Sequence, residues 1–220
     1  MNERRAMRSL PIRPRDARSP VLRRAAGLAL AVTAALMSAG CVRLGAKPPS
    51  TLLTITSQAA APAGEVLSAT SQQALFVDLP VVPRAIATLR VAVRDSANSF
   101  AYVKDASWVD TPARQFQGVL AETIRVRSGR LVLDPGQYLA RRGQMLEGNL
   151  LEFGVDAARM RAVVTYDATL MAPDGQQVTR QRFTAAVPVG RIDAASVAPA
   201  ISQAANEVAT AVADWIKAQG

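Results

Sequence analysis

Period-two alternation of apolar and polar residues is the clearest pattern in this chain, and it is strongest in residues 159–171. One alternate set there is apolar: Met160, Ala162, Val164, Tyr166, Ala168 and Leu170. The other set is polar: Arg159, Arg161, Thr165, Asp167 and Thr169. This pattern is typical of an antiparallel strand that packs one face on a core and turns the other face toward water.

Seven further segments predict strands, because each is rich in apolar or β-branched residues and is bounded by turn residues. They are residues 51–57, 74–80, 88–95, 99–104, 130–134, 150–156 and 178–189. Residues 150–156 place three apolar residues on one face, namely Leu151, Phe153 and Val155. In the last segment Val178 and Phe183 fall on opposite faces, so we expect a β-bulge between them.

Two segments show the three- and four-residue spacing of an amphipathic helix. Before the first, Asp110 or Thr111 can serve as the N-cap, and Pro112 fits the first helical position. Gly129 ends this helix, whose apolar stripe is Phe116, Val119, Leu120 and Ile124. The second helix is expected over residues 194–217, with a stripe of Ile201, Ala204, Val208, Ala211 and Trp215.

Together these elements predict the fold class. We expect an α+β fold in which an antiparallel β-sheet is packed on one side by two main helices. Residues 51–220 are enough for one domain with a substantial core, so we predict a single domain over that range.

The first 50 residues have a different character. Residues 1–24 carry eight Arg against two acidic residues, and residues 25–37 are uncharged but too short to span a bilayer as a helix. This combination is typical of a signal peptide. Residues 41–50 contain Gly and two Pro without an apolar period, and we expect them to form a short tether.

Cys41 is the only cysteine in the chain, and it follows the small residues Ser38, Ala39 and Gly40. This stretch resembles the bacterial lipobox, although Ser38 stands where Leu is usual. We therefore predict a lipoprotein signal peptide over residues 1–40, cleavage between Gly40 and Cys41, and diacylglycerol and N-acyl groups on the Cys41 residue. The alternative is an ordinary secretory signal that ends near a cysteine, but a free thiol in an oxidising compartment would be a liability.

Charge and residue chemistry exclude several functions. The net charge of +9 comes mostly from the leader, since residues 41–220 hold 18 basic and 15 acidic residues, or +3. We therefore expect no nucleic-acid binding. The chain has no histidine, which removes the usual base for a Ser or Cys nucleophile and a common metal ligand. The carboxylates of Glu147, Glu152 and Asp156 are not held together by their spacing, so we predict no catalytic site, no metal and no cofactor beyond the lipid on Cys41.

Three large aromatic residues are candidates for structural or interface roles, namely Trp108, Phe116 and Trp215. Both tryptophans lie on or beside an amphipathic helix, where a tryptophan more often anchors a core than forms a binding platform.

The run "LPVVPRAIATLRVAVRDSANSFAYVKDASWVDTPARQFQGVLAETI", the hairpin around "TYDATLMAPDG" and the terminal Ala-rich helix together resemble the ABC-type transport auxiliary lipoproteins. The resemblance covers Thr51 to Gln219. It implies a periplasmic lipoprotein that works beside an ABC transporter permease and ATPase and an MCE-domain protein, which move phospholipids or other hydrophobic cargo between two membranes. It also implies a docking component rather than an enzyme, and relatives that assemble into homo-oligomeric rings.

The position after the lipidated cysteine bears on localisation. Val42 stands where Asp would favour retention in the inner membrane, so we expect the anchor to lie in the inner leaflet of the outer membrane. In this interpretation an exposed face or edge of the sheet docks the MCE partner. Two alternatives remain, a lipid carrier with its own cavity and a purely structural envelope lipoprotein.

Overall fold

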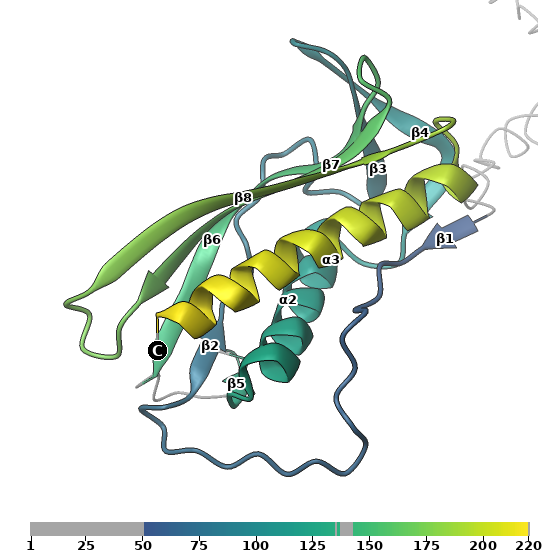
Figure 1. The fold of residues 1–220 in the computed structure, drawn as a ribbon. Helices are drawn as coiled ribbons and strands as arrows, with labels where there is room; N and C mark the ends of the chain where they lie inside the picture. Colours follow the sequence, from purple (N-terminus) through teal and green to yellow (C-terminus); the bar gives the residue numbers. More distant parts are fainter. Residues whose placement is uncertain (1–50, 135, 137–142, 220) are drawn as a thin grey trace, which may run out of the picture. The chain divides into compact units, whose positions relative to one another are not determined.

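The structure is a computed structural model, and it describes residues 51–134, 136 and 143–219. Those residues form eight strands and two helices (Figure 1). In chain order these are β1 (Thr51–Leu53), β2 (Leu75–Val77), β3 (Arg90–Ser96), β4 (Ser99–Trp108), α2 (Pro112–Ser128), β5 (Val132–Leu133), β6 (Gln144–Asp156), β7 (Arg161–Met171), β8 (Val178–Pro188) and α3 (Ala194–Ala218). The predictions made for the signal peptide, for the tether and for Cys41 lie outside the described residues.

All eight strands belong to one mixed sheet organised around β6. One edge of β6 pairs antiparallel with β7, which pairs antiparallel with β8. The other edge of β6 takes β2 at its start and β3 at its end, both parallel. The hairpin of β3 and β4 is antiparallel, while β1 joins β4 and β5 joins β2 in parallel. The predicted α+β single domain is therefore confirmed, but the sheet is mixed rather than antiparallel throughout.

A bulge at Leu151 changes which residues of β6 point into the core. Leu150 lies opposite Tyr166 and Glu152 lies opposite Thr165, so Leu151 has no partner of its own. Leu150 is fully buried and Leu151 is half-buried, whereas the sequence pattern grouped Leu151 with the buried Phe153. That prediction was wrong because one extra residue shifts the two-residue period by one position.

The bulge expected in β8 is absent from the described pairing. Eleven consecutive pairs join β7 and β8 without a register shift. Val178 and Phe183 do lie on opposite faces, as predicted, but an odd separation of five residues in a regular strand is enough to explain this.

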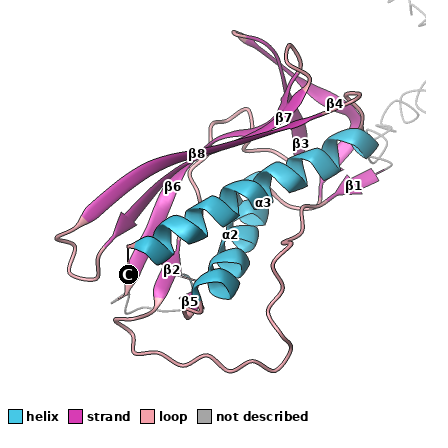
Figure 2. Cartoon of the chain, in the orientation of Figure 1, coloured by secondary structure: helices cyan, strands magenta, loops and turns pink. Residues whose placement is uncertain are grey.

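Both helices cover the same face of the sheet, as Figure 2 shows. Pro112 occupies the first helical position of α2, and Gly129 ends this helix with a left-handed backbone (φ 67°). Asp193 caps α3 by accepting a hydrogen bond from the Ser196 backbone N–H at 2.9 Å. The buried stripe of α3 is rich in alanine, which lets the helix lie close to α2, β7 and β8. None of the helices in the described part of the chain is long and apolar enough to cross a membrane.

The core between the helices and the sheet is filled by large side chains. Phe116 on α2 is fully buried and meets Phe153 of β6 and Tyr166 of β7, with ring centroids 6.5 and 5.3 Å apart. Trp108 is also buried, and the centroid of its ring lies 5.5 Å from that of Phe153. Edge-to-face and tilted contacts of this kind stabilise aromatic clusters beyond the area they bury.

Candidate functional site

The candidate functional site is the helix-free face of β3, β6, β7 and β8, which we call the polar face. Its side chains belong to the alternate residues that do not enter the core, and they include Arg94, Glu152, Thr165, Asp167, Arg180, Arg182 and Thr184. The sequence pattern predicted that this face lies in water. Asp167 and Thr165 are instead 4% and 5% exposed, because their charged and hydroxylated neighbours close over them.

Asp167 on β7 is held by two arginines of the edge strand β8. Arg182, directly opposite in the register, donates from Nη2 to Oδ2 at 2.7 Å and from Nε to Oδ1. Arg180 donates to Oδ2 at 3.0 Å. The hydrogen bonds from Arg182 are the main reason that the pKa of Asp167 is lowered to about 2, which keeps this buried carboxylate ionised.

A second group of contacts crosses four strands. The Glu152 carboxylate forms an ion pair with Arg94 of β3 and accepts a hydrogen bond from the Thr165 hydroxyl at 2.7 Å. The Thr165 hydroxyl is in turn 3.2 Å from that of Thr184 on β8. The bulge at Leu151 makes this possible, since it turns Glu152 to the polar face while Leu150 stays in the core.

Aromatic residues of β4 extend this face on the side of β3. The Arg90 guanidinium carbon lies 3.7 Å above the centre of the Tyr102 ring, and that of Arg94 lies 5.8 Å from the centre of Phe100. The Phe100 side chain is 50% exposed. Beside it a small hollow is lined by apolar residues including Ile86, Ala92, Leu151 and Val163. An exposed aromatic residue, a neighbouring arginine and a hollow are common at protein-protein contacts.

The edge of the sheet next to this face is also open. Among the described strands, β8 pairs only with β7 along its eleven residues. Its outward positions carry Arg180 and Arg182, whose side chains are each 62% exposed. Charged side chains on an edge strand oppose unspecific pairing with strands of other chains. A partner at this edge therefore has to match its charges.

The residues that the sequence singled out lie elsewhere. Trp108 and Phe116 are buried in the core, where they cannot contact a partner without unfolding. Trp215 on α3 is half-buried and lies 5.6 Å from Phe183 between ring centroids, on the helix-covered side of the sheet. Gly40 and Cys41 fall outside the described residues. The carboxylates of Glu152 and Asp156 are each engaged by an arginine, Arg94 and Arg159 respectively.

Sequence reasoning missed the pairing of Asp167 with the two arginines. The signal that was present is the spacing of Arg180 and Arg182 on one face of a strand predicted to neighbour that of Asp167. Only the register of β7 and β8 brings Arg182 opposite Asp167.

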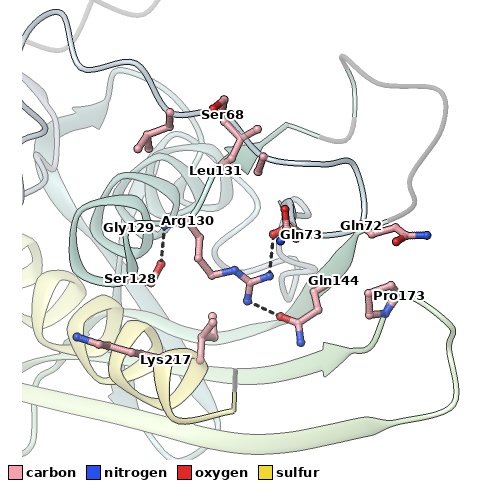
Figure 3. A pocket seen from close by; sticks show the side chains of 13 residues that line it. Ser68, Gln72, Gln73, Ser128, Gly129, Arg130, Leu131, Gln144, Pro173 and Lys217 are labelled. Atoms are coloured by element: carbon pink, nitrogen blue, oxygen red, sulfur yellow. Dashed lines mark hydrogen bonds between the residues drawn. The ribbon is translucent and has the colours of Figure 1, made fainter.

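A separate cavity of about 530 Å³ lies near the C-terminal ends of α2 and α3 and the start of β6 (Figure 3). Arg130 projects into it and hydrogen-bonds to Gln144 and to the Gln73 carbonyl oxygen. Within the described ranges, no group of three or more Cys, Asp or Glu residues is arranged to hold a metal ion. The polar face and the cavity both present side chains that form hydrogen bonds, and the polar face also contains ion pairs.

An α+β domain with helices on one face of its sheet and an ordered polar network on the other has known relatives. The family model described as the ABC-type transport auxiliary lipoprotein component matches residues 54–213. The chain belongs to this family. As a lipoprotein component of a transport system, it is associated with an envelope membrane.

Solved structures share the fold. A crystal structure of a protein from Xanthomonas campestris is 23% identical, with a TM-score of 0.63 over 77% of this chain and 97% of that chain. A crystal structure of an uncharacterized protein is 14% identical, with a TM-score of 0.58 over 66% of this chain and 92% of that chain. No curated protein matches the sequence.

Proposed function

We propose that this protein is a lipid-anchored accessory component of an ABC transporter that works with an MCE-domain protein to move phospholipid or another hydrophobic cargo across the envelope. It acts by docking and assembly rather than by catalysis. The observation that carries this proposal is the polar face, where a chain of contacts from β3 to β8 is ordered and no helix of the described part covers it.

The polar face has the physical properties of a docking surface. Its arginine side chains are fixed by Asp167 and Glu152, so little conformational entropy is lost when a partner binds. Arg180, Arg182 and the exposed Phe100 are of the residue types that contribute most to binding energy at protein interfaces. We expect the partner to present carboxylates toward these arginines and an apolar side chain toward Phe100.

The anchor in this proposal is the lipid on Cys41, and the anchored leaflet is the inner leaflet of the outer membrane. The support is the lipobox-like sequence, the family's description as a lipoprotein and Val42 at the sorting position. A Cys41→Ser variant should move from the membrane fraction to the soluble periplasmic fraction. If this variant stayed with the membrane after a high-salt wash, the lipid on Cys41 would not be the anchor.

Co-purification in mild detergent tests the docking function. The full-length protein should recover an ABC permease, its ATPase and an MCE-domain protein, and the Arg180→Gln variant should recover less of them. The matched control is Arg114→Gln, because Arg114 is an exposed arginine on α2. Failure of the unaltered protein to recover any of these subunits would contradict the proposal.

The 530 Å³ cavity favours one alternative, a carrier that holds lipid itself. A carrier would show bound phospholipid on a Cys41→Ser form in native mass spectrometry. The same spectrum tests assembly, since we propose that copies of the chain associate into a ring. A purely structural envelope protein would instead leave transport unchanged when its gene is deleted.

A further inference from the structure

The cavity near the ends of α2 and α3 is distinct from the polar face and has a different composition. Its walls come from the loop before β2, the end of α2 and the residues after it, the start of β6, the turn between β7 and β8, and the last turn of α3. Its volume of about 530 Å³ lies within the range of small-molecule sites. Apolar lining is supplied by Leu67, Ala69, Leu131, Pro173 and Ile216.

Arg130 is the main charged group in the cavity, and it is half-buried. Its Nη1 donates to the Gln144 side-chain oxygen at 2.5 Å, and its Nη2 donates to the Gln73 carbonyl oxygen at 3.1 Å. Neither partner carries a negative charge, and the structure shows no carboxylate within salt-bridge distance of Arg130 among the residues it describes. Burial lowers the pKa of this guanidinium, which means that its charge is poorly solvated.

The remaining donors of Arg130 are available to a ligand. A guanidinium has five N–H groups, and the two hydrogen bonds to Gln144 and Gln73 leave about three without a partner among the residues that the structure describes. The planar guanidinium matches the oxygens of a phosphate group well.

Lys217 lies at the rim of the cavity on the α3 side, and in Figure 3 its side chain extends away from the Arg130 guanidinium. The described lining residues include no Asp or Glu. The carboxylate of Asp214, one turn earlier on α3, is already bound by Arg127 through contacts of 2.8 and 2.9 Å. Arg130 therefore lies in a partly apolar cavity without a described counter-ion, whereas Lys217 at the rim is exposed to solvent.

A competing explanation is that these cations only neutralise the helix ends. Both helices end near the cavity, and cations near helix C-termini are stabilising on their own. That role needs neither a cavity nor the two polar contacts that hold the Arg130 side chain in place. The two explanations differ in whether an added anion binds.

We propose that this cavity binds a phosphate group, with Arg130 as its charged ligand and Lys217 as a further positive charge at the rim. The group is either a free phosphate or the head of an amphiphile whose apolar part lies on Leu67, Leu131 and Ile216. This site does not depend on the proposed docking function, because none of its lining residues belongs to the polar face.

Isothermal titration calorimetry on the full-length protein in neutral detergent tests the proposal at fixed ionic strength. The ligands are inorganic phosphate, dihexanoyl phosphatidic acid and dihexanoylglycerol, which lacks the phosphate. We expect both phosphate ligands to bind and dihexanoylglycerol not to bind. Phosphatidic acid that binds about tenfold more tightly than phosphate would identify an amphiphile, and equal affinities would identify a free phosphate group.

Three variants assign the binding to this cavity. Arg130→Gln should weaken phosphate binding about tenfold or more, and Lys217→Gln should weaken it about threefold to tenfold. Arg84→Gln removes an exposed charge outside the cavity lining and should leave binding unchanged. The Lys217→Gln result remains decisive if Arg130→Gln does not fold, since Lys217 is exposed.

Two results would overturn the proposal. One is that the unaltered protein binds neither phosphate ligand. The other is that the folded Arg130→Gln and Lys217→Gln variants bind phosphate as tightly as the unaltered protein. The Arg130→Gln variant should still recover the transporter subunits in co-purification, so failure of the phosphate site and failure of the docking function are distinguishable.

Discussion

Asp167 on β7 lies directly opposite Arg182 on β8, and two nitrogens of this arginine contact both oxygens of the carboxylate. The carboxylate is 4% exposed, although it lies on the face without a helix. The pair adds a side-chain link to the eleven register pairs that join β7 and β8, and it orders the arginine side chains that we assign to docking.

Removing Arg182 should therefore destabilise the fold. Arg182→Ala leaves the Asp167 carboxylate with only Arg180 as a charged partner, so we expect the free energy of unfolding to fall. Urea denaturation followed by circular dichroism measures this difference. The control is Arg159→Ala, because Arg159 is 77% exposed and its 3.7 Å pair with Asp156 should contribute less than about 1 kcal/mol. Equal effects of the two variants would contradict the assigned role of Arg182.

The same pair predicts a dependence of stability on pH. The pKa of Asp167 is about 2 in the folded protein and about 3.9 in an unfolded chain. A lowered folded-state pKa means that the stabilisation is fully present above about pH 4 and is lost as the pH falls toward 2. In Asp167→Asn, the free energy of unfolding should fall less steeply between pH 4 and 2. Parallel curves for the two proteins over this interval would contradict the prediction.

Two glycines should respond in opposite directions to the same substitution. A Cβ added at Gly148 on β6 would collide with the Asp167 backbone and the Tyr166 ring, so Gly148→Ala should destabilise the fold by about 1–3 kcal/mol. A Cβ added at Gly118 on α2 meets no atom within 4 Å. Gly118→Ala should stabilise the helix by up to about 1 kcal/mol, since alanine has the higher helix propensity. Thermal unfolding measures both changes, and a shift of the same sign in both variants would contradict the packing described.

The loss of stability caused by replacing an aromatic residue should depend on how deeply its side chain is buried. Phe116 is fully buried between α2 and the sheet, and Phe116→Ala should cost about 3–5 kcal/mol. Trp215 is half-buried, so Trp215→Ala should cost clearly less although it removes more atoms. Chemical denaturation compares them, and a larger loss for Trp215→Ala would show that α3 contributes more to the core than its exposure suggests.

The elements of the fold were largely predictable, since the stripe from Phe116 to Ile124 and the alternation from Ala162 to Leu170 both describe buried faces. The parallel pairing of β2 and β3 with β6 was not, because period-two alternation is the same in either strand direction. The bulge at Leu151 was not predicted either, because nothing in the local sequence distinguishes Leu151 from its neighbours.

The candidate site was less predictable than the fold. The sequence alternation predicts that Asp167 is exposed to solvent. Only the register of β7 and β8 shows that Arg182 lies beside it. Arg130 follows Gly129, whose left-handed backbone ends α2, and only the fold brings it to Gln144 and Gln73. These contacts join residues far apart in the sequence, so local patterns do not contain them.

Site-specific photo-crosslinking in living cells tests the central claim most directly. A photoreactive phenylalanine analogue is placed at Phe100 on the polar face or, as the control, at Val126, which is 40% exposed on α2. We predict that irradiation joins the Phe100 position, but not the Val126 position, to an MCE-domain protein or an ABC transporter subunit. Crosslinks from Val126 alone, or from neither position in cells that contain the assembled transporter, would contradict docking through the polar face.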